Sequence, residues 1–248
     1  MESRTRYPAG VWPCCIGEED GKGYLLLGRQ GGGLHHTKAV KRALGMVNRQ
    51  WEEQLDGTEG WCVFWGKADP EDASSLHTAA REGSEEGLNV FGSMQFLVEV
   101  LRDSSAHYEV FGNCFLICLG VLSASQRDEV VALHKRKRNR TINPTKREMV
   151  ELRWFEASDV RERALAHRQL CKEERWDTDM VFDGMAAGEF VRRWFACELA
   201  QTVDWNEEPL CSLCKWGKHP FPQARDRFGE WLRWEWTPEE KKDKEKEK

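Results

Sequence analysis

Three glutamates crowd one short segment of the chain, at positions 82, 85 and 86 of "GKADPEDASSLHTAAREGSEEGLN" (residues 66–89). On a helix they would lie within an arc of about 100°. Like charges spaced three or four residues apart repel one another by a few tenths of a kcal/mol per pair. Carboxylate oxygens are hard ligands that suit Mg²⁺ or Mn²⁺. The pattern therefore predicts a metal site formed by Glu82, Glu85 and Glu86, and its plain alternative is a solvated acidic helix face.

A helix is the element that would position these carboxylates. Leu76, Ala79, Ala80 and Gly83 recur at helical spacing and predict a narrow apolar face beside the glutamates. Gly83 is a poor helix residue, so it indicates either close packing or an irregular helix end. The apolar run at 61–65, "WCVFW", predicts a strand that leads into the segment.

The same segment resembles the Nudix signature, G-x5-E-x7-R-E-U-x-E-E-x-G-U, in which U is apolar. The preceding "WCVFWGK" is similar to the family's strand before the glycine turn, and "EMVELRWFEASDV" (148–160) is similar to its later E-x-x-E-x-x-W strand. The positions that match the signature are Gly66, Asp72 at the first acidic place, Arg81-Glu82 and Glu85-Glu86.

The resemblance implies an α+β chain folded as an α/β/α sandwich around a mixed sheet. It also implies metal-dependent hydrolysis of the diphosphate linkage between a nucleoside and another moiety. "GKADPED" and "TAARE" resemble the coenzyme A diphosphatase branch. The implied substrate is therefore a coenzyme A-like or dinucleotide-like compound, with capped RNA as a further candidate.

Individual roles follow from the resemblance. Glu82, Glu85 and Glu86 would bind Mg²⁺ or Mn²⁺, and Arg81 would pair with Asp72 to brace the helix against the loop. The general base would be one of the three glutamates or a downstream acid such as Glu148. The catalytic set is thus Glu85, Glu82, Arg81 and Glu148, and the residues assigned to substrate or phosphate binding are Gly66, Lys67, Arg29, Lys135 and Arg136.

The signature is altered in several places. Asp72 stands where the family has glutamate, and eight residues instead of seven separate it from Arg81. Gly83 occupies the apolar place, and the end of the box is one residue short. These departures keep open an alternative of another class, a catalytically silent Nudix-fold protein that binds nucleotide or RNA.

A basic segment offers a second clue to the substrate. Residues 134–147, "HKRKRNRTINPTKR", hold seven lysines and arginines in a chain whose net charge is −5. Such a cluster can bind polyphosphate or an RNA backbone, or act as a nuclear localisation signal. The alternative is an idle, solvated loop between two strands.

The remaining patterns predict the rest of the chain. Residues 10–28 favour strand, turn and strand, and 37–56 favour a helix; strands are expected at 94–101, 108–122 and 149–157, and helices at 158–172 and 179–200. The domain plan is a Nudix domain at 8–172, an extension at 173–238 that is helical and packs on the core through its tryptophans, and a charged disordered tail at 239–248.

The nine cysteines are scattered and odd in number, which favours a reducing compartment, the cytoplasm or the nucleus. Cys211, Cys214 and His219 begin a zinc-like spacing, but no fourth ligand follows, so two ordinary thiols are expected. The start of the chain lacks the apolar core of a secretory signal, and no apolar run is long enough to span a bilayer, so no membrane partner is expected.

Overall fold

The computed structural model describes residues 7–30, 60–141, 149–173, 178–221 and 228. The strands of this described part are β1 (Ala9–Gly17), β2 (Gly23–Gln30), β3 (Gly60–Cys62), β4 (Phe64–Gly66), β5 (His107–Phe111), β6 (Cys114–Leu122) and β7 (Met149–Glu156). Its helices are α3 (Ser75–Glu86), α4 (Met94–Arg102), α5 (Ala124–Arg140), α6 (Ala157–Lys172), α7 (Arg193–Gln201) and α8 (Leu210–Trp216).

The strands of the described part form one mixed sheet in the order β3-β2-β1-β6-β5, with β4 paired to β1 and β7 paired to β2. β1 and β6 are parallel, and the other paired strands are antiparallel. β1 and β2 pair only near the turn that joins them, where Cys14 lies opposite Leu25. Farther from the turn, β4 pairs with the start of β1 and β3 with the end of β2. This arrangement places Gly66 opposite Ala9.

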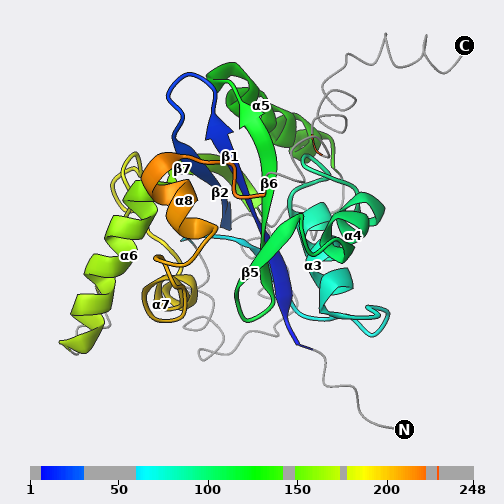
Figure 1. Cartoon of the computed structure of the whole chain (residues 1–248). Helices are drawn as coiled ribbons and strands as arrows, with labels where there is room; N and C mark the ends of the chain where they lie inside the picture. The colour runs from blue at the N-terminus through cyan, green and yellow to red at the C-terminus, as the bar shows by residue number, and fades with distance from the viewer. Residues whose placement is uncertain (1–6, 31–59, 142–148, 174–177, 222–227, 229–248) are drawn as a thin grey trace, which may run out of the picture.

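Helices cover both faces of the sheet (Figure 1): α3, α4 and α5 lie on one side, and α6, α7 and α8 on the other. Neighbouring residues of β1 point to opposite layers, as the alternation of a strand requires. Val11 packs against Gly83 of α3: a Cβ added to this glycine would lie 2.5 Å from Cγ2 of Val11. Trp12 packs edge-on against Phe195 of α7 at 5.5 Å. The predicted mixed sheet with helices is confirmed. None of the described helices is both long and apolar enough to cross a membrane.

The prediction of a strand at 94–101 is wrong, because this run forms α4. Ser93 caps the helix by accepting a hydrogen bond from the Phe96 amide at 3.3 Å. Leu97 and Leu101 are buried, one turn apart, while Glu99 between them is exposed. A short apolar run fits either a buried strand or a buried helix, and here the cap and the packing on α3 decide for the helix.

The prediction of one helix over 179–200 is also wrong in its first half. Only α7 is helical there, and the preceding residues form turns. Gly184 and Gly188 adopt φ values of 83° and 85°, which continue no right-handed helix. Val191 instead pairs with Trp61 of β3. The expected helix at 158–172 is present as α6.

The alternative of a plain loop at the basic segment is wrong for residues 134–140, which form the second half of α5. Ser123 and Gln126 begin this helix with a reciprocal capping box. Lysine and arginine are good helix formers, so basic composition alone does not indicate a loop. The rest of the basic segment, the expected helix at 37–56 and the tail at 239–248 lie outside the described residues.

Aromatic side chains join the region after residue 173 to the sheet. Trp205 packs edge-on against Trp12 at 6.2 Å, and Trp194 lies 6.0 Å from Trp65. Phe228 packs against Phe96 of α4 at 5.2 Å. Trp205, Trp194 and Phe228 therefore each pack against another aromatic side chain of the described structure.

Candidate active site

Gly66 is the last residue of β4, and the side chain of Glu82 from α3 lies directly against it. A Cβ built on this glycine would lie 2.1 Å from Oε1 of Glu82, well inside van der Waals contact. The absence of a side chain at position 66 therefore lets a carboxylate lie directly on the end of a strand. This contact joins the first and the central residues of the box, which are sixteen positions apart.

Arg81 ties the loop between β4 and α3 to the helix. Its guanidinium donates to the carbonyl oxygen of Lys67 at 2.7 Å and to Oδ2 of Asp72 at 3.1 Å. The expected pairing with Asp72 is present. Burial opposes the charge of Arg81, but the hydrogen bond to Asp72 and the neighbouring acidic charges outweigh it and raise the pKa of the guanidinium.

Asp72 is the most enclosed partner of this arginine, with a side chain that is 3% exposed. Its Oδ2 also accepts hydrogen bonds from the Asp69 amide at 2.8 Å and from the Thr78 hydroxyl at 3.0 Å. Burial raises the pKa of Asp72, but the hydrogen bonds from Arg81, the Asp69 amide and Thr78 lower it by more. The net pKa therefore lies below the ordinary value.

We expect Asp72→Asn to lower the free energy of unfolding by about 2 kcal/mol at pH 7, because charged hydrogen bonds to a buried carboxylate are lost. A carboxyl group whose pKa is lower in the folded state stabilises the protein at pH values above its unfolded-state pKa, which is near 4. This stabilisation is lost as the pH falls through the folded-state pKa. The difference between wild type and variant should therefore shrink below about pH 4. Urea unfolding at several pH values measures it, and a difference that persists at pH 2 would contradict the assignment.

Glu82 and Glu85 converge on the same atom of Arg81. Nη1 lies 2.9 Å from Oε1 of Glu82 and 3.3 Å from Oε2 of Glu85. Asp69 and Asp72 also lie within 3.5 Å of this guanidinium. Among the described residues, one positive charge thus faces four negative ones. Arg81 therefore offsets part of the repulsion between the glutamates.

Glu86 points to a different side of the helix end. The Trp65 amide donates to its Oε2 at 2.9 Å, and Nε2 of Gln30 donates to its Oε1 at 3.1 Å. Glu86 is 6% exposed, so its carboxylate depends on these donors for its orientation. The three glutamates of the box are therefore held by two sets of partners, one centred on Arg81 and one on the ends of β2 and β4.

The donor chemistry of this site fits Mg²⁺ or Mn²⁺, which both prefer carboxylate oxygens. In the part of the chain that the structure describes, no group of three or more histidine, cysteine, aspartate or glutamate side chains is already arranged to hold a metal ion. Glu82 and Glu85 nevertheless meet at one point beside Gly66. The residues that would hold a divalent cation are Glu82, Glu85 and Glu86.

Arg29 belongs to a closed ring of alternating charges on β2 and β7. Glu151 and Glu189 lie 3.0 and 3.7 Å from this guanidinium, and Arg153 lies 2.7 Å from Glu151 and 3.2 Å from Glu189. Arg29, which the sequence assigns to phosphate binding, pairs with two carboxylates of this ring and keeps 38% of its side chain exposed. Lys67 contributes its carbonyl oxygen to Arg81 and lies in an exposed loop.

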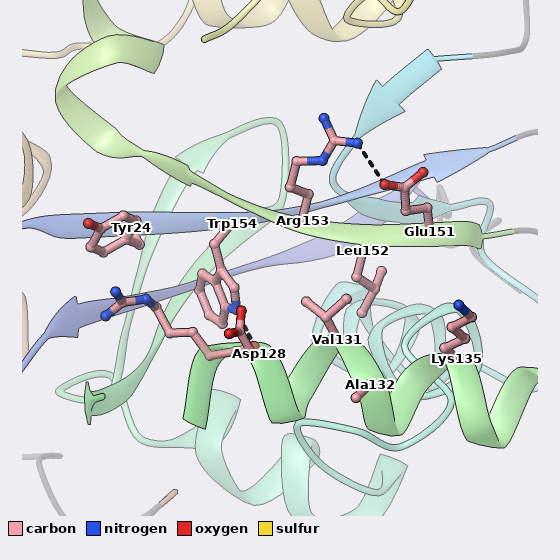
Figure 2. Close-up of a pocket in the computed structure, with 10 residues that line it drawn as sticks. Tyr24, Asp128, Val131, Ala132, Lys135, Glu151, Leu152, Arg153 and Trp154 are labelled. Atoms are coloured by element: carbon pink, nitrogen blue, oxygen red, sulfur yellow. Dashed lines mark hydrogen bonds and ion pairs between the residues drawn. The ribbon is translucent and has the colours of Figure 1, made fainter. Parts of the chain in front are cut away.

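A hollow of about 550 Å³ lies between β7 and α5, and Lys135 lies at one end of it (Figure 2). Leu152 and Trp154 point from β7 toward α5, whereas Glu151 and Arg153 point to the other side of the strand. The indole of Trp154 is fixed because its Nε1 donates to the carbonyl of Arg127 at 3.1 Å. The hollow thus combines an aromatic wall with a cationic end.

Two predicted site residues and the predicted pair of thiols remain to be placed. Arg136 is on α5 and pairs with Glu129 of the same helix. Glu148 lies outside the described residues. Cys211 and Cys214 are buried one turn apart on α8.

Gln30, Arg192 and His134 are contacts of the site that the sequence did not reveal. Gln30 follows Arg29 directly, but a single glutamine in a strand carries no signal. Arg192 comes from a segment 106 positions beyond Glu86. His134 belongs to the basic segment, where its ring hydrogen-bonds the backbone of Glu86.

The chain matches no family model, no curated protein and no solved structure.

Proposed function

We propose that the protein is a Nudix-type pyrophosphohydrolase that depends on Mg²⁺ or Mn²⁺. Its substrate would be a nucleoside diphosphate linked to another moiety, either coenzyme A-like or dinucleotide-like, or capped RNA. The observation that carries the proposal is the meeting of Glu82 and Glu85 on one nitrogen of Arg81, beside a glycine that leaves room for Glu82. A mixed sheet with helices on both faces is compatible with the Nudix α/β/α sandwich.

Each residue of the site has a part in this chemistry. A divalent cation bound by the glutamates neutralises the diphosphate and lowers the pKa of a bound water. Arg81 holds the loop and the helix together through Lys67 and Asp72, so the carboxylates keep their relative positions. Glu85 is the most exposed of the three glutamates, which suits a group that meets substrate or accepts a proton.

The cysteines agree with an intracellular setting for this reaction. All nine are free thiols, although eight of them are buried in a folded structure. Unpaired cysteines in this number are typical of proteins from reducing compartments. We therefore place the protein in the cytoplasm or the nucleus.

A substrate panel tests the proposal. Coenzyme A, dinucleoside polyphosphates, nucleotide sugars and capped RNA would be incubated with the full chain and Mg²⁺ or Mn²⁺, and the products identified by mass spectrometry. Cleavage of a diphosphate linkage that requires the metal supports the proposal. Metal-independent binding of nucleotide without cleavage of any compound would instead favour the silent binding protein.

Helix α5 favours RNA or another polyanion among these substrates. Lys135, Arg136 and Arg140 are exposed on its second half, and His134 joins that half to the end of α3. A chain of phosphates lying along α5 would therefore pass close to the glutamates. Phosphate contacts of this kind depend strongly on salt concentration.

We expect the triple replacement of Lys135, Arg136 and Arg140 by glutamine to weaken binding of single-stranded RNA and to make it less dependent on salt. Three lost phosphate contacts would reduce the slope of log affinity against log salt by about 2. Fluorescence anisotropy between 50 and 200 mM salt measures this slope. The matched control replaces three exposed basic residues on other elements, Arg102, Lys172 and Arg193, and changes the net charge equally. Equal effects of both triple variants would argue against a specific role for α5.

A further inference from the structure

Glu86 is the most enclosed of the three glutamates, and donors from two strands hold its carboxylate. The Trp65 amide of β4 lies 2.9 Å from one oxygen, and the side-chain nitrogen of Gln30 of β2 lies 3.1 Å from the other. One donor lies on each carboxylate oxygen, so the two together orient the plane of the carboxylate. The orientation of Glu86 therefore depends on that of Gln30.

A second side chain fixes the amide of Gln30. Its Oε1 accepts a hydrogen bond from Nη1 of Arg192, while its Nε2 donates to Glu86. A carboxylate only accepts and a guanidinium only donates, so both contacts require the same orientation of the amide. The flipped amide would place oxygen against the carboxylate and nitrogen against the guanidinium. Arg192 therefore keeps Gln30 in the orientation that supports Glu86.

Arg192 reaches the site from the C-terminal region, directly before α7. Its backbone amide donates to the Trp61 carbonyl at 3.0 Å, and the Trp61 amide donates to the Phe190 carbonyl at 2.9 Å. These bonds fix the segment to β3, which continues into β4 and so to Trp65. The same stretch of chain therefore anchors Arg192 and supplies the other donor to Glu86.

We infer that Arg192 and Gln30 are positioning residues for the carboxylate of Glu86, so that the region after residue 173 completes the metal site. This inference rests on the proposed function, because it gives Glu86 the role of a metal ligand. Mutation of a residue that orients a metal ligand typically lowers metal affinity or activity by about 10- to 100-fold.

Binding of Mn²⁺ alone to the full chain, measured by titration calorimetry, tests the inference without reference to turnover. Arg192→Met and Gln30→Leu are each expected to weaken Mn²⁺ binding by about tenfold. Arg192→Lys keeps a donor and should restore part of the affinity. In a Glu86→Gln background, Arg192→Met should have no further effect, because the group that it positions no longer carries a charge.

Arg168 offers a matched control. Like Arg192, it connects the C-terminal region to the rest of the fold: Arg168 of α6 donates hydrogen bonds to the carbonyls of Ala200 and Val203. Arg168→Met should lower the midpoint of thermal unfolding and leave Mn²⁺ affinity unchanged. Equal losses of affinity in Arg168→Met and Arg192→Met, or an Arg192→Met effect that persists in the Glu86→Gln background, would overturn the inference.

The outcome for the wild type separates this inference from the proposed function. Mn²⁺ binding that Glu85→Gln weakens and Arg192→Met does not would overturn the positioning role alone. A wild-type protein that binds no Mn²⁺ would overturn both the positioning role and the metal-dependent hydrolase.

Discussion

Replacing Glu85 with glutamine is expected to lower kcat/KM for the hydrolysed diphosphate by about a thousandfold, as loss of a group that stabilises transition-state charge commonly does. The amide is neutral and is a weaker ligand for a hard cation than a carboxylate. Glu85 also shares Nη1 of Arg81 with Glu82, so the replacement removes half of the paired carboxylates at that point. Steady-state kinetics on the best substrate of the panel measure the loss.

The fold should remain intact in this variant. Glu85 is 43% exposed and makes one ion pair with Arg81, a type of contact that contributes at most about 1 kcal/mol. Removing one of several clustered negative charges also relieves repulsion along α3. Thermal unfolding monitored by circular dichroism checks this, so that lost activity is not confused with lost structure.

Glu71→Gln is the matched control for Glu85→Gln. Glu71 is an exposed acid on the loop before α3, and its replacement changes the net charge near the site by the same amount. It should retain wild-type kinetics. If Glu85→Gln retained wild-type activity, or if Glu71→Gln lost as much, the role given to the paired carboxylates would be untenable.

The second large effect is expected from His134, a buried histidine on α5. The residue is 2% exposed. Burial lowers its pKa, the hydrogen bond to the Glu86 backbone partly opposes this, and the charge of Arg138 lowers it further, to about 4. His134 is therefore neutral in the folded protein throughout the physiological range.

The sign of the pH effect follows from this difference. In the unfolded chain histidine takes up a proton near pH 6.5, whereas folded His134 does so only near pH 4. The unfolded state thus binds more protons between these values, and stability falls as the pH drops from about 6.5 to 4. The loss from this residue amounts to about 3 kcal/mol.

We expect His134→Leu to flatten the dependence of unfolding free energy on pH in this window. Urea unfolding between pH 7.5 and 4 measures the dependence. Val130→Ala serves as the control, because it removes buried volume one turn away on the same helix and should lower stability by a similar amount at every pH. A His134→Leu curve parallel to that of wild type would show that His134 does not cause the acid sensitivity.

Local patterns predicted the elements whose signals lie within a few residues. The helical spacing of Leu76, Ala79, Ala80 and Gly83 predicted the apolar face of α3; the last three residues are buried, and Leu76 is half-buried. Gly83 proved to be a site of close packing against Val11, one of the two interpretations that its presence left open. The pairing of Asp72 with Arg81 was likewise expected, because both residues belong to one motif.

Local patterns failed where the same residues are compatible with two kinds of secondary structure. The apolar run of α4 fits a strand as well as a helix, and the basic residues of α5 fit a solvated loop as well as a helix. In both cases the capping residues Ser93 and Ser123 and the packing against neighbouring elements decided the outcome. Two glycines with positive φ, Gly184 and Gly188, ended the regular pattern that predicted a longer helix before α7.

The sequence by itself determined which acids crowd one helix, which glycine precedes them and which arginine braces them. Only the tertiary structure decided that Arg81 draws Glu82 and Glu85 together, while Glu86 turns to Trp65 and Gln30. It also decided that Arg192 stands behind Gln30. The physical reason is range: periodicity and charge spacing report contacts within a few turns of chain, whereas a hydrogen bond between distant segments leaves no pattern in a single sequence.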